Sequence, residues 1–278
     1  MFNGRNLLIA TKHHKEKVIA PILEKELGVK CIVSLNFDTD ELGTFTGEIE
    51  RKNDPITTAR NKCEMAMELA NCDLAIASEG SFGPHPSIFF ATADDEFLLF
   101  LDKRTGLEII ARELSLQTNF NGSEIKSIRE LKDFARKASF PTHGLILRKN
   151  KDDFSEIKKG ITDWDTLLTT YTNLSKVDSI VYVETDMRAM FNPTRMQVIK
   201  KATEKLVNKI NTYCPQCNIP GFDITSSKQG LPCGLCNSPT RSILSYLYTC
   251  KKCGFAKEEK YPNGKTTEEP MYCDNCNP

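Results

Sequence analysis

The chain has 278 residues, 40% of them hydrophobic and 27% charged, so it can bury one large core or two unequal ones. Lys plus Arg and Asp plus Glu both number 37, which excludes an overall field drawing the protein towards nucleic acid or an anionic membrane. The apolar run at residues 7–10 is too short for a signal peptide, and no run of about 18 apolar residues occurs. We therefore expect a cytoplasmic protein that does not associate with membranes.

Residues 1–210 alternate strand-like apolar runs with helical patterns, which predicts an α/β domain with a boundary before residue 211. In chain order, we expect strands over residues 7–11, 31–35, 74–77, 97–102, 107–113, 144–147 and 179–184, and helices over residues 15–27, 57–70, 125–138 and 193–210. Gly28 should end the first helix, because glycine readily adopts a left-handed conformation. The two strands flanking residues 103–106 should form a hairpin.

Three segments concentrate polar residues where predicted strands end, which is the usual place for ligands in α/β sheets. The first is IATKHHKEK, where a strand passes into a helix. Free backbone N–H groups and basic side chains at such a helix start suit a phosphate. The candidate ligand residues here are Thr11, Lys12, Lys15 and Lys17. The alternative is a basic first turn on a solvated helix face.

The second segment is ASEGSFGPHP, in which Glu79 directly follows a buried strand. We interpret the two glycines and two prolines as an irregular loop that presents this carboxylate as a functional group. The alternative is that Glu79 only caps a helix or a turn.

The third segment, ETDMRAMFNPTRM, places Glu184 and Asp186 at a strand end. Around the following helix start lie Arg188, Asn192 and Arg195, which could clamp a multiply charged ligand. The alternative is a well-capped helix with exterior arginines.

Eight of the eleven cysteines lie in four CxxC pairs after residue 210, which indicates metal binding and not a disulfide scaffold. The predicted zinc ligands are Cys214, Cys217, Cys233, Cys236, Cys250, Cys253, Cys273 and Cys276. Two such pairs complete the tetrahedron that zinc prefers, so four pairs predict two structural zinc ions in a double zinc ribbon over residues 211–278. Iron competes for four thiolates, but Gly, Pro and Lys around the pairs favour zinc.

Spacing alone does not decide which pairs share a metal, because 15, 13 and 19 residues separate successive pairs. We favour the sequential arrangement, in which the first two pairs form one site and the last two form the other. A nested arrangement, with the two inner pairs sharing one ion, ranks second. An interleaved arrangement ranks third.

The tail is a poor candidate for nucleic-acid binding. From residue 211 onward it has seven basic and six acidic residues. Two zinc ions with four thiolates each would bring its net charge to about −3, which disfavours phosphate contacts. A packing role or docking to a protein partner is the better expectation.

Taken in order, these segments resemble the inosine/xanthosine triphosphatase superfamily of house-cleaning nucleotide pyrophosphatases. LLIATKHHKEKVIAPILEKELG has the strand, polar loop and helix that open that family, with Lys15 or Lys17 at the phosphate-contacting position. The family's next glutamate corresponds to Glu48 or Glu50 in GTFTGEIERKNDPITTARNKCEMA, and its acidic loop to Glu79 in DLAIASEGSFGP. The likeness is good over residues 5–115 and looser to residue 205.

The resemblance implies a mixed-sheet pyrophosphatase fold that often forms a homodimer. It also implies a Mg²⁺ ion held by Glu79 with Glu48 or Glu50, while lysines with Arg188 and Arg195 neutralise phosphates. We accordingly expect a Mg²⁺-dependent hydrolase of a noncanonical or modified nucleotide. The alternative is an inactive nucleotide-sensing or protein-docking module. The whole arrangement, with NPTRM and the CxxC tail, also resembles an uncharacterised family of unknown function.

Overall fold

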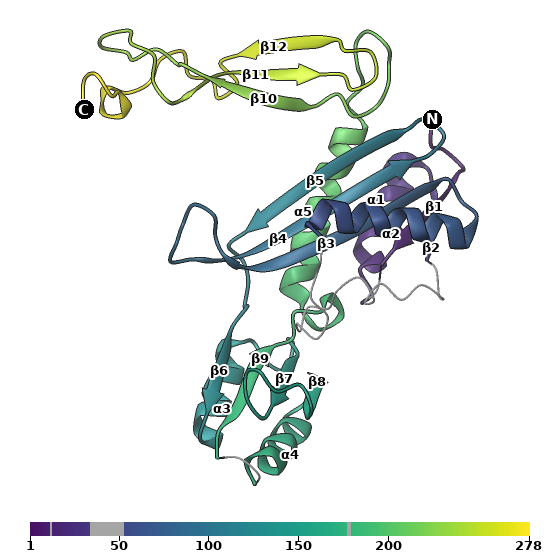
Figure 1. Ribbon diagram of the computed structural model, residues 1–278, viewed down its shortest axis with the longest axis vertical. Coiled ribbons are helices and arrows are strands. Elements are labelled where there is room, and N and C mark those ends of the chain that lie inside the picture. The colour runs from purple at the N-terminus through teal and green to yellow at the C-terminus, as the bar shows by residue number, and fades with distance from the viewer. Residues whose placement is uncertain (12, 34–52, 177–178) are drawn as a thin grey trace. The chain divides into compact units, whose positions relative to one another are not determined.

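The computed structural model describes residues 1–11, 13–33, 53–176 and 179–278 (Figure 1). The chain divides into two compact units, Met1–Val207 and Asn208–Pro278, whereas the sequence placed a boundary between residues 210 and 211. The described residues form a mixed α/β fold with several sheets and five α-helices. Among them, no helix combines the length and the apolar character that a membrane span needs.

The first unit is built on a five-stranded sheet with the strand order β2-β1-β3-β4-β5. The strands are β1 (Asn6–Ala10), β2 (Lys30–Val33), β3 (Leu74–Pro84), β4 (Thr92–Asp102) and β5 (Leu107–Ser115). β1 runs parallel to β2 and β3, while β4 and β5 add an antiparallel hairpin at the other side of β3. The sheet is therefore mixed, and the predicted hairpin is confirmed.

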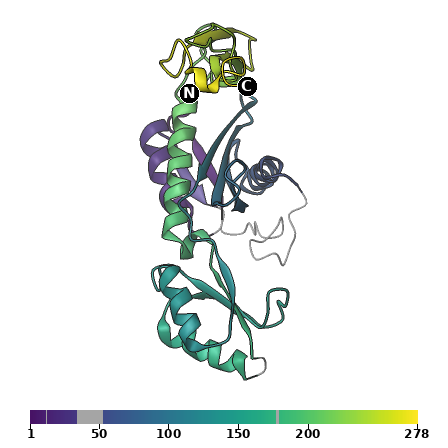
Figure 2. The same ribbon diagram turned by 90° about the vertical axis from the view of Figure 1, so that its left-hand side faces the viewer.

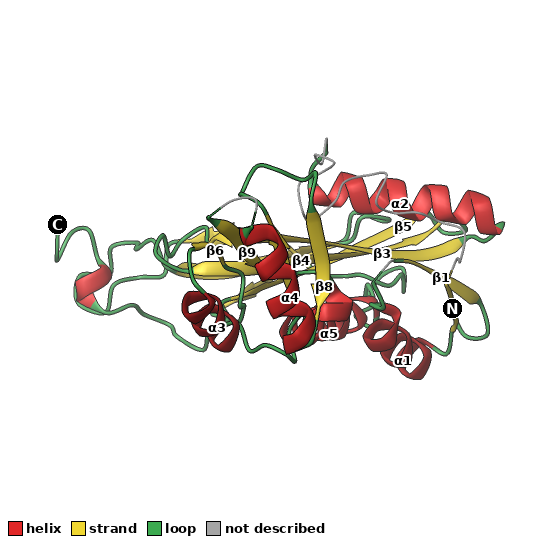
Figure 3. Cartoon of the chain, turned by 90° about the horizontal axis from the view of Figure 1, so that it is seen from below, coloured by secondary structure: helices red, strands yellow, loops and turns green. Residues whose placement is uncertain are grey.

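Helices cover both faces of this sheet (Figure 3). They are α1 (Glu16–Leu27), α2 (Pro55–Ala70) and α5 (Pro193–Ile210). α2 packs on one face, where its small residues Ala59, Cys63 and Ala66 meet Ala75 and Ala77 of β3. α1 and α5 lie on the opposite face. Because side chains alternate along a strand, odd-numbered β3 residues near its start face α2 and even-numbered ones face α1 and α5.

Local signals define the helix ends well. Asp54 caps α2 by accepting hydrogen bonds from the backbone N–H groups of Ile56 and Thr57. Gly28 ends α1 in the left-handed conformation, with φ of 66°, as the sequence predicts. The predicted bounds of the last helix are confirmed.

The segment expected as an irregular loop after residue 77 is part of a strand. β3 continues to Pro84, and the backbone from Ser78 onward pairs with β4 in unbroken register. Glycine, proline and acidic residues have low strand propensity, so the sequence suggested a loop where long-range pairing with β4 makes a strand. Glu79 consequently lies on a rigid element.

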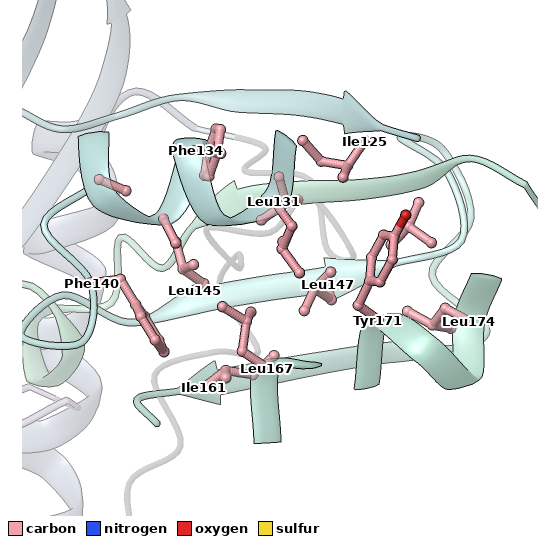
Figure 4. Packing of buried hydrophobic residues seen from close by; sticks show 14 residues of the cluster. Ile125, Leu131, Phe134, Phe140, Leu145, Leu147, Ile161, Leu167, Tyr171 and Leu174 are labelled. Atoms are coloured by element: carbon pink, nitrogen blue, oxygen red, sulfur yellow. The ribbon is translucent and has the colours of Figure 1, made fainter. Parts of the chain in front are cut away.

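A second, four-stranded antiparallel sheet lies in the same unit, with the order β6-β9-β7-β8. Its elements are β6 (Gly122–Ile125), α3 (Ile128–Lys137), β7 (Leu145–Arg148), β8 (Ile157–Ile161), α4 (Trp164–Ser175) and β9 (Val181–Thr185). Both helices lie on the same side of this sheet (Figure 2). Buried side chains such as Leu131, Leu147 and Leu167 fill the space between the helices and the sheet (Figure 4). The sequence patterns predicted neither β6 nor β8 nor α4.

The second unit contains a three-stranded antiparallel sheet and the four CxxC pairs. The strands are β10 (Ile224–Gln229), β11 (Ile243–Thr249) and β12 (Ala256–Lys260). All residues of β10 and β12 are exposed, so this sheet has little apolar core of its own.

Candidate functional site

A candidate site lies where β3 extends beyond the end of its parallel neighbour β1. The last β1 pair joins Ala10 to Ala77, and β3 continues past it to Pro84. Ligands of open α/β sheets bind at the carboxyl ends of parallel strands. At this edge, Lys15 directly precedes α1 and Arg195 lies in the first turn of α5.

Six buried ionisable residues gather at this edge, and we call them the charge cluster. They are Lys15, Lys62, Glu79, Asp94, Glu96 and Arg195. Three are basic and three acidic, and none is more than 8% exposed. Lysine, arginine and carboxylate side chains are almost never buried to this extent unless they are paired. The charge cluster is therefore an unusual polar feature of the first unit.

Specific contacts join members of the cluster. Lys15 donates a hydrogen bond from Nζ to Ser78 Oγ at 2.9 Å, and Lys62 forms an ion pair with Glu79. Arg195 donates from Nε to Glu96 Oε1 at 2.6 Å, while its Nη1 group donates to the Met187 carbonyl at 2.5 Å. The guanidinium carbon of Arg195 also lies 5.1 Å from the centroid of the Phe82 ring. Through these contacts, α1, α2, α5 and the segment that follows β9 of the second sheet are linked to β3 and β4.

Burial shifts the pKa of two members towards neutrality. Burial, with a further contribution from Arg195, lowers the pKa of Lys15 to about 8. Burial raises the pKa of Asp94 to about 8, and the neighbouring Glu96 raises it further while Arg195 and Lys15 oppose the shift. Groups that change charge near neutral pH are suited to proton transfer and are common at functional sites.

Gly80 is a requirement of this arrangement. A Cβ atom at that position would lie 2.3 Å from Glu96 Oε1 and 2.6 Å from Arg195 Nη2. At Gly83, three residues along the same strand, a Cβ atom would meet nothing within 4 Å. The Glu96–Arg195 ion pair can therefore lie over β3 only because residue 80 has no Cβ atom.

The replacement Gly80→Ala should therefore lower the free energy of unfolding by about 1–3 kcal/mol, because the added methyl group overpacks the Glu96–Arg195 pair. Gly83→Ala is the matched control and should change stability by about 0.5 kcal/mol or less. Urea denaturation of both variants measures the difference. Equal stabilities for the two variants would contradict the close approach at Gly80.

The turn before α1 carries backbone strain. His13 and His14 both have positive φ, 68° and 62°, in a region that non-glycine residues seldom adopt. Such strain is often stored at functional sites. The predicted ligand Thr11 lies at the start of this turn, where its N–H donates to the Ile9 carbonyl. Lys17 is exposed, with its Nζ 3.4 Å from His14 Nδ1.

The residues of the third predicted segment have different roles. Arg195 belongs to the charge cluster. Arg188 instead forms an ion pair with Asp186 at 2.6 Å, and the same Asp186 carboxylate accepts a hydrogen bond from the Gly160 N–H. Asn192 caps α5, because its Oδ1 accepts the N–H of Arg195 at 3.0 Å. The alternative of a well-capped helix thus describes Asn192, while Arg195 is buried and not exterior.

Three predicted site residues, Lys12, Glu48 and Glu50, lie outside the described residues. Three residues of the charge cluster, Lys62, Asp94 and Glu96, are not among the predicted site residues. Asp94 and Glu96 occur in TADDEFLLFLD, where the acidic run resembles a loop before the strand. Their spacing of two residues, which Leu98 and Phe100 continue, places both on one face of the strand, but this spacing does not show that the face is buried at their positions.

Eight of the cysteines form two tetrads, and within each tetrad the four sulfur atoms lie within 4.8 Å of one another. The first tetrad contains Cys214, Cys217, Cys250 and Cys253, and the second contains Cys233, Cys236, Cys273 and Cys276. This is the interleaved arrangement, so the favoured sequential arrangement is wrong, as is the nested one. The antiparallel pairing of β10, β11 and β12 brings alternate pairs together.

The tetrads fit a tetrahedral metal ion. The Sγ–Sγ separations between Cys214 and Cys253 and between Cys217 and Cys250 are 3.7 and 3.6 Å. The corresponding separations in the second tetrad are 3.9 and 3.7 Å. Four sulfurs at about 2.3 Å from a zinc ion at the centre of a tetrahedron lie about 3.8 Å apart. The two tetrads could therefore bind two metal ions such as zinc.

These features define a mixed α/β protein with a buried charge cluster and a tail of two interleaved cysteine tetrads. A family model described as "Domain of unknown function (DUF6671)" matches residues 62–278, so the chain belongs to that family. This confirms the resemblance to an uncharacterised family. No curated protein matches the chain.

Proposed function

We propose that the charge cluster is the active site of a Mg²⁺-dependent phosphohydrolase. Its substrate would be a noncanonical or modified nucleotide, and the tetrads would hold two structural zinc ions. The observation that carries this proposal is a group of buried lysine, arginine and carboxylate side chains that interact electrostatically just past the carboxyl end of β1, along β3. Glu79 and Lys62 lie on the α2 face of the sheet, and the other four members lie on the opposite face. The substrate class is taken from the segments within residues 5–115 that resemble the inosine/xanthosine triphosphatase superfamily, whereas the family model that matches the chain is a different one.

The basic members of the cluster would bind and orient phosphate groups. Lys15 and Arg195 lie on helix starts, where backbone N–H groups add positive potential. Arg195 is held by the Met187 carbonyl and Glu96, so it need not reorganise when charge develops on a leaving group. A bound Mg²⁺ ion would supply further charge neutralisation and lower the pKa of the attacking water.

Glu79 is the proposed general base. Its carboxylate is buried and held by Lys62 from α2, on a strand that fixes its backbone. A positioned carboxylate can accept a proton from water when the water attacks a phosphoryl group. Lys62 and β3 then serve to position this carboxylate.

Glu79→Gln should reduce turnover by about a hundredfold or more, because the amide cannot accept the proton. The measurement is release of pyrophosphate and phosphate from canonical and deaminated nucleoside triphosphates with Mg²⁺ or Mn²⁺. Glu68→Gln, at an exposed position of α2, is the matched control and should retain wild-type rates. Circular dichroism checks that both variants are folded.

Two results would contradict the hydrolase. One is wild-type turnover that persists in Glu79→Gln. The other is saturable nucleotide binding without turnover in the wild type, which would instead support the nucleotide-sensing module.

A further inference from the structure

We propose that Asp94 and Glu96 form a binding site for one divalent, oxygen-ligated cation of the Mg²⁺ or Mn²⁺ type. The family resemblance implied that Glu79 with Glu48 or Glu50 holds such a cation, so Asp94 and Glu96 are a different set of ligands. The role of the cation in catalysis rests on the proposed function, whereas its binding can be measured separately.

The strand geometry places the two carboxylates together. Asp94 and Glu96 are two residues apart on β4, so their side chains project from the same face of the sheet. Across the ladder, they stand opposite Phe82 and Gly80 of β3. Gly80 has no side chain, which leaves the space above the strand to the Glu96 carboxylate.

These carboxylates are buried with unused acceptor atoms. Asp94 is 1% exposed and Glu96 is fully buried. Within the described part of the chain, neither Asp94 oxygen has a hydrogen-bond partner, and the same holds for Glu96 Oε2. Buried polar atoms are normally satisfied, so three unused oxygens on one face point to a ligand that would bind them.

The donor set selects a hard cation. Carboxylate oxygens suit Mg²⁺, Mn²⁺ or Ca²⁺, whereas zinc is drawn to the thiolate tetrads. Among the described residues, only the tetrads gather three or more potential ligand side chains, so Asp94 and Glu96 would act as a pair. Mg²⁺ is commonly held by one or two carboxylates and completes its octahedron with water and phosphate oxygens.

The surrounding charges indicate how the cation and an anion would meet. Glu96 uses Oε1 for Arg195 and retains Oε2, while Lys15 lies close enough to influence both acidic residues electrostatically. The two basic groups repel a lone cation but attract phosphate. We therefore expect Mn²⁺ to bind more tightly when inorganic pyrophosphate is present.

Asp95 provides a matched control within the same strand. Its side chain projects from the opposite face and accepts two hydrogen bonds at 2.7 Å from Arg112. Its oxygens are thus already used. Asp95→Asn and Asp94→Asn change the same charge at adjacent positions, but only the second removes a proposed ligand.

The test is an electron paramagnetic resonance titration of free Mn²⁺ with the full-length, zinc-loaded protein, with and without pyrophosphate. Wild type and Asp95→Asn should bind one Mn²⁺ ion, and Asp94→Asn should bind it at least about tenfold more weakly. In wild-type protein, Mn²⁺ should also broaden the amide signals of residues 93–97 and 78–82. This second measurement needs no variant and therefore stands if Asp94→Asn fails to fold.

Unchanged Mn²⁺ affinity in folded Asp94→Asn, or broadening confined to other parts of the chain, would overturn the proposal. The result also separates the two proposals. Mn²⁺ binding that depends on Asp94 without nucleotide turnover would retain the cation site and reject the hydrolase. Turnover that survives Asp94→Asn, with Mn²⁺ bound elsewhere, would do the reverse.

Discussion

Replacing Cys250 with serine should abolish binding of both zinc ions that we propose for the tail, and not only of the one that this thiol would bind. In the interleaved arrangement, the Cys233/Cys236 pair lies in the chain between the two halves of the first tetrad. The strand β11 runs from that pair to Cys250, so it belongs to the framework of both tetrads. Loss of one ion would release β11 and separate the ligands of the other.

The size of the effect follows from the small apolar core of this unit. Structural zinc contributes about 10–16 kcal/mol of binding free energy in small domains, which exceeds or matches the total stability of a typical domain. The strands β10 and β12 are fully exposed and offer little to replace it. We expect zinc content to fall from two ions per chain towards none, with collapse of the amide dispersion of residues 208–278.

Elemental analysis and a ¹H–¹⁵N correlation spectrum of the full-length protein measure this outcome. Cys72→Ser is the control, because that thiol lies outside both tetrads and should leave two zinc ions bound. Retention of one zinc ion by Cys250→Ser, with native signals around Cys233 and Cys273, would show instead that the two sites fold independently.

Arg195→Met should destabilise the first unit by about 3–5 kcal/mol, because it leaves the buried Glu96 carboxylate without its cation. Both side chains of this pair are 0% exposed. Adding Glu96→Gln should recover much of the loss, since the double variant buries no uncompensated charge. A double-mutant cycle then isolates the coupling between the two side chains.

The measurement is urea denaturation monitored by the fluorescence of Trp164, the only tryptophan of the chain. Arg136→Met is the matched control, since Arg136 and Asp133 form an exposed pair with side chains 67% and 52% accessible. That replacement should change stability by about 1 kcal/mol or less. A comparably small effect of Arg195→Met would contradict a buried, mutually dependent pair.

Local sequence determined much of the first unit. Gly28 and Pro193 mark helix ends through their own backbone preferences, and the hairpin turn after β4 lies where its residues predict. The CxxC spacing likewise identified all eight members of the tetrads, because two thiols on one tight turn are a local feature. Glu79 and Arg195 were recognised as candidate site residues from the polar segments in which they lie.

Tertiary structure alone decided the features that depend on distant segments. Similar gaps between the CxxC pairs left their pairing open, and the register of β10, β11 and β12 selected the interleaved tetrads. In the same way, pairing with β4 makes the glycine- and proline-containing end of β3 a strand, against its local propensity. Asp94 and Glu96 joined the charge cluster for this reason: burial of an acidic residue depends on which chain segments pack over it, and no local pattern encodes that.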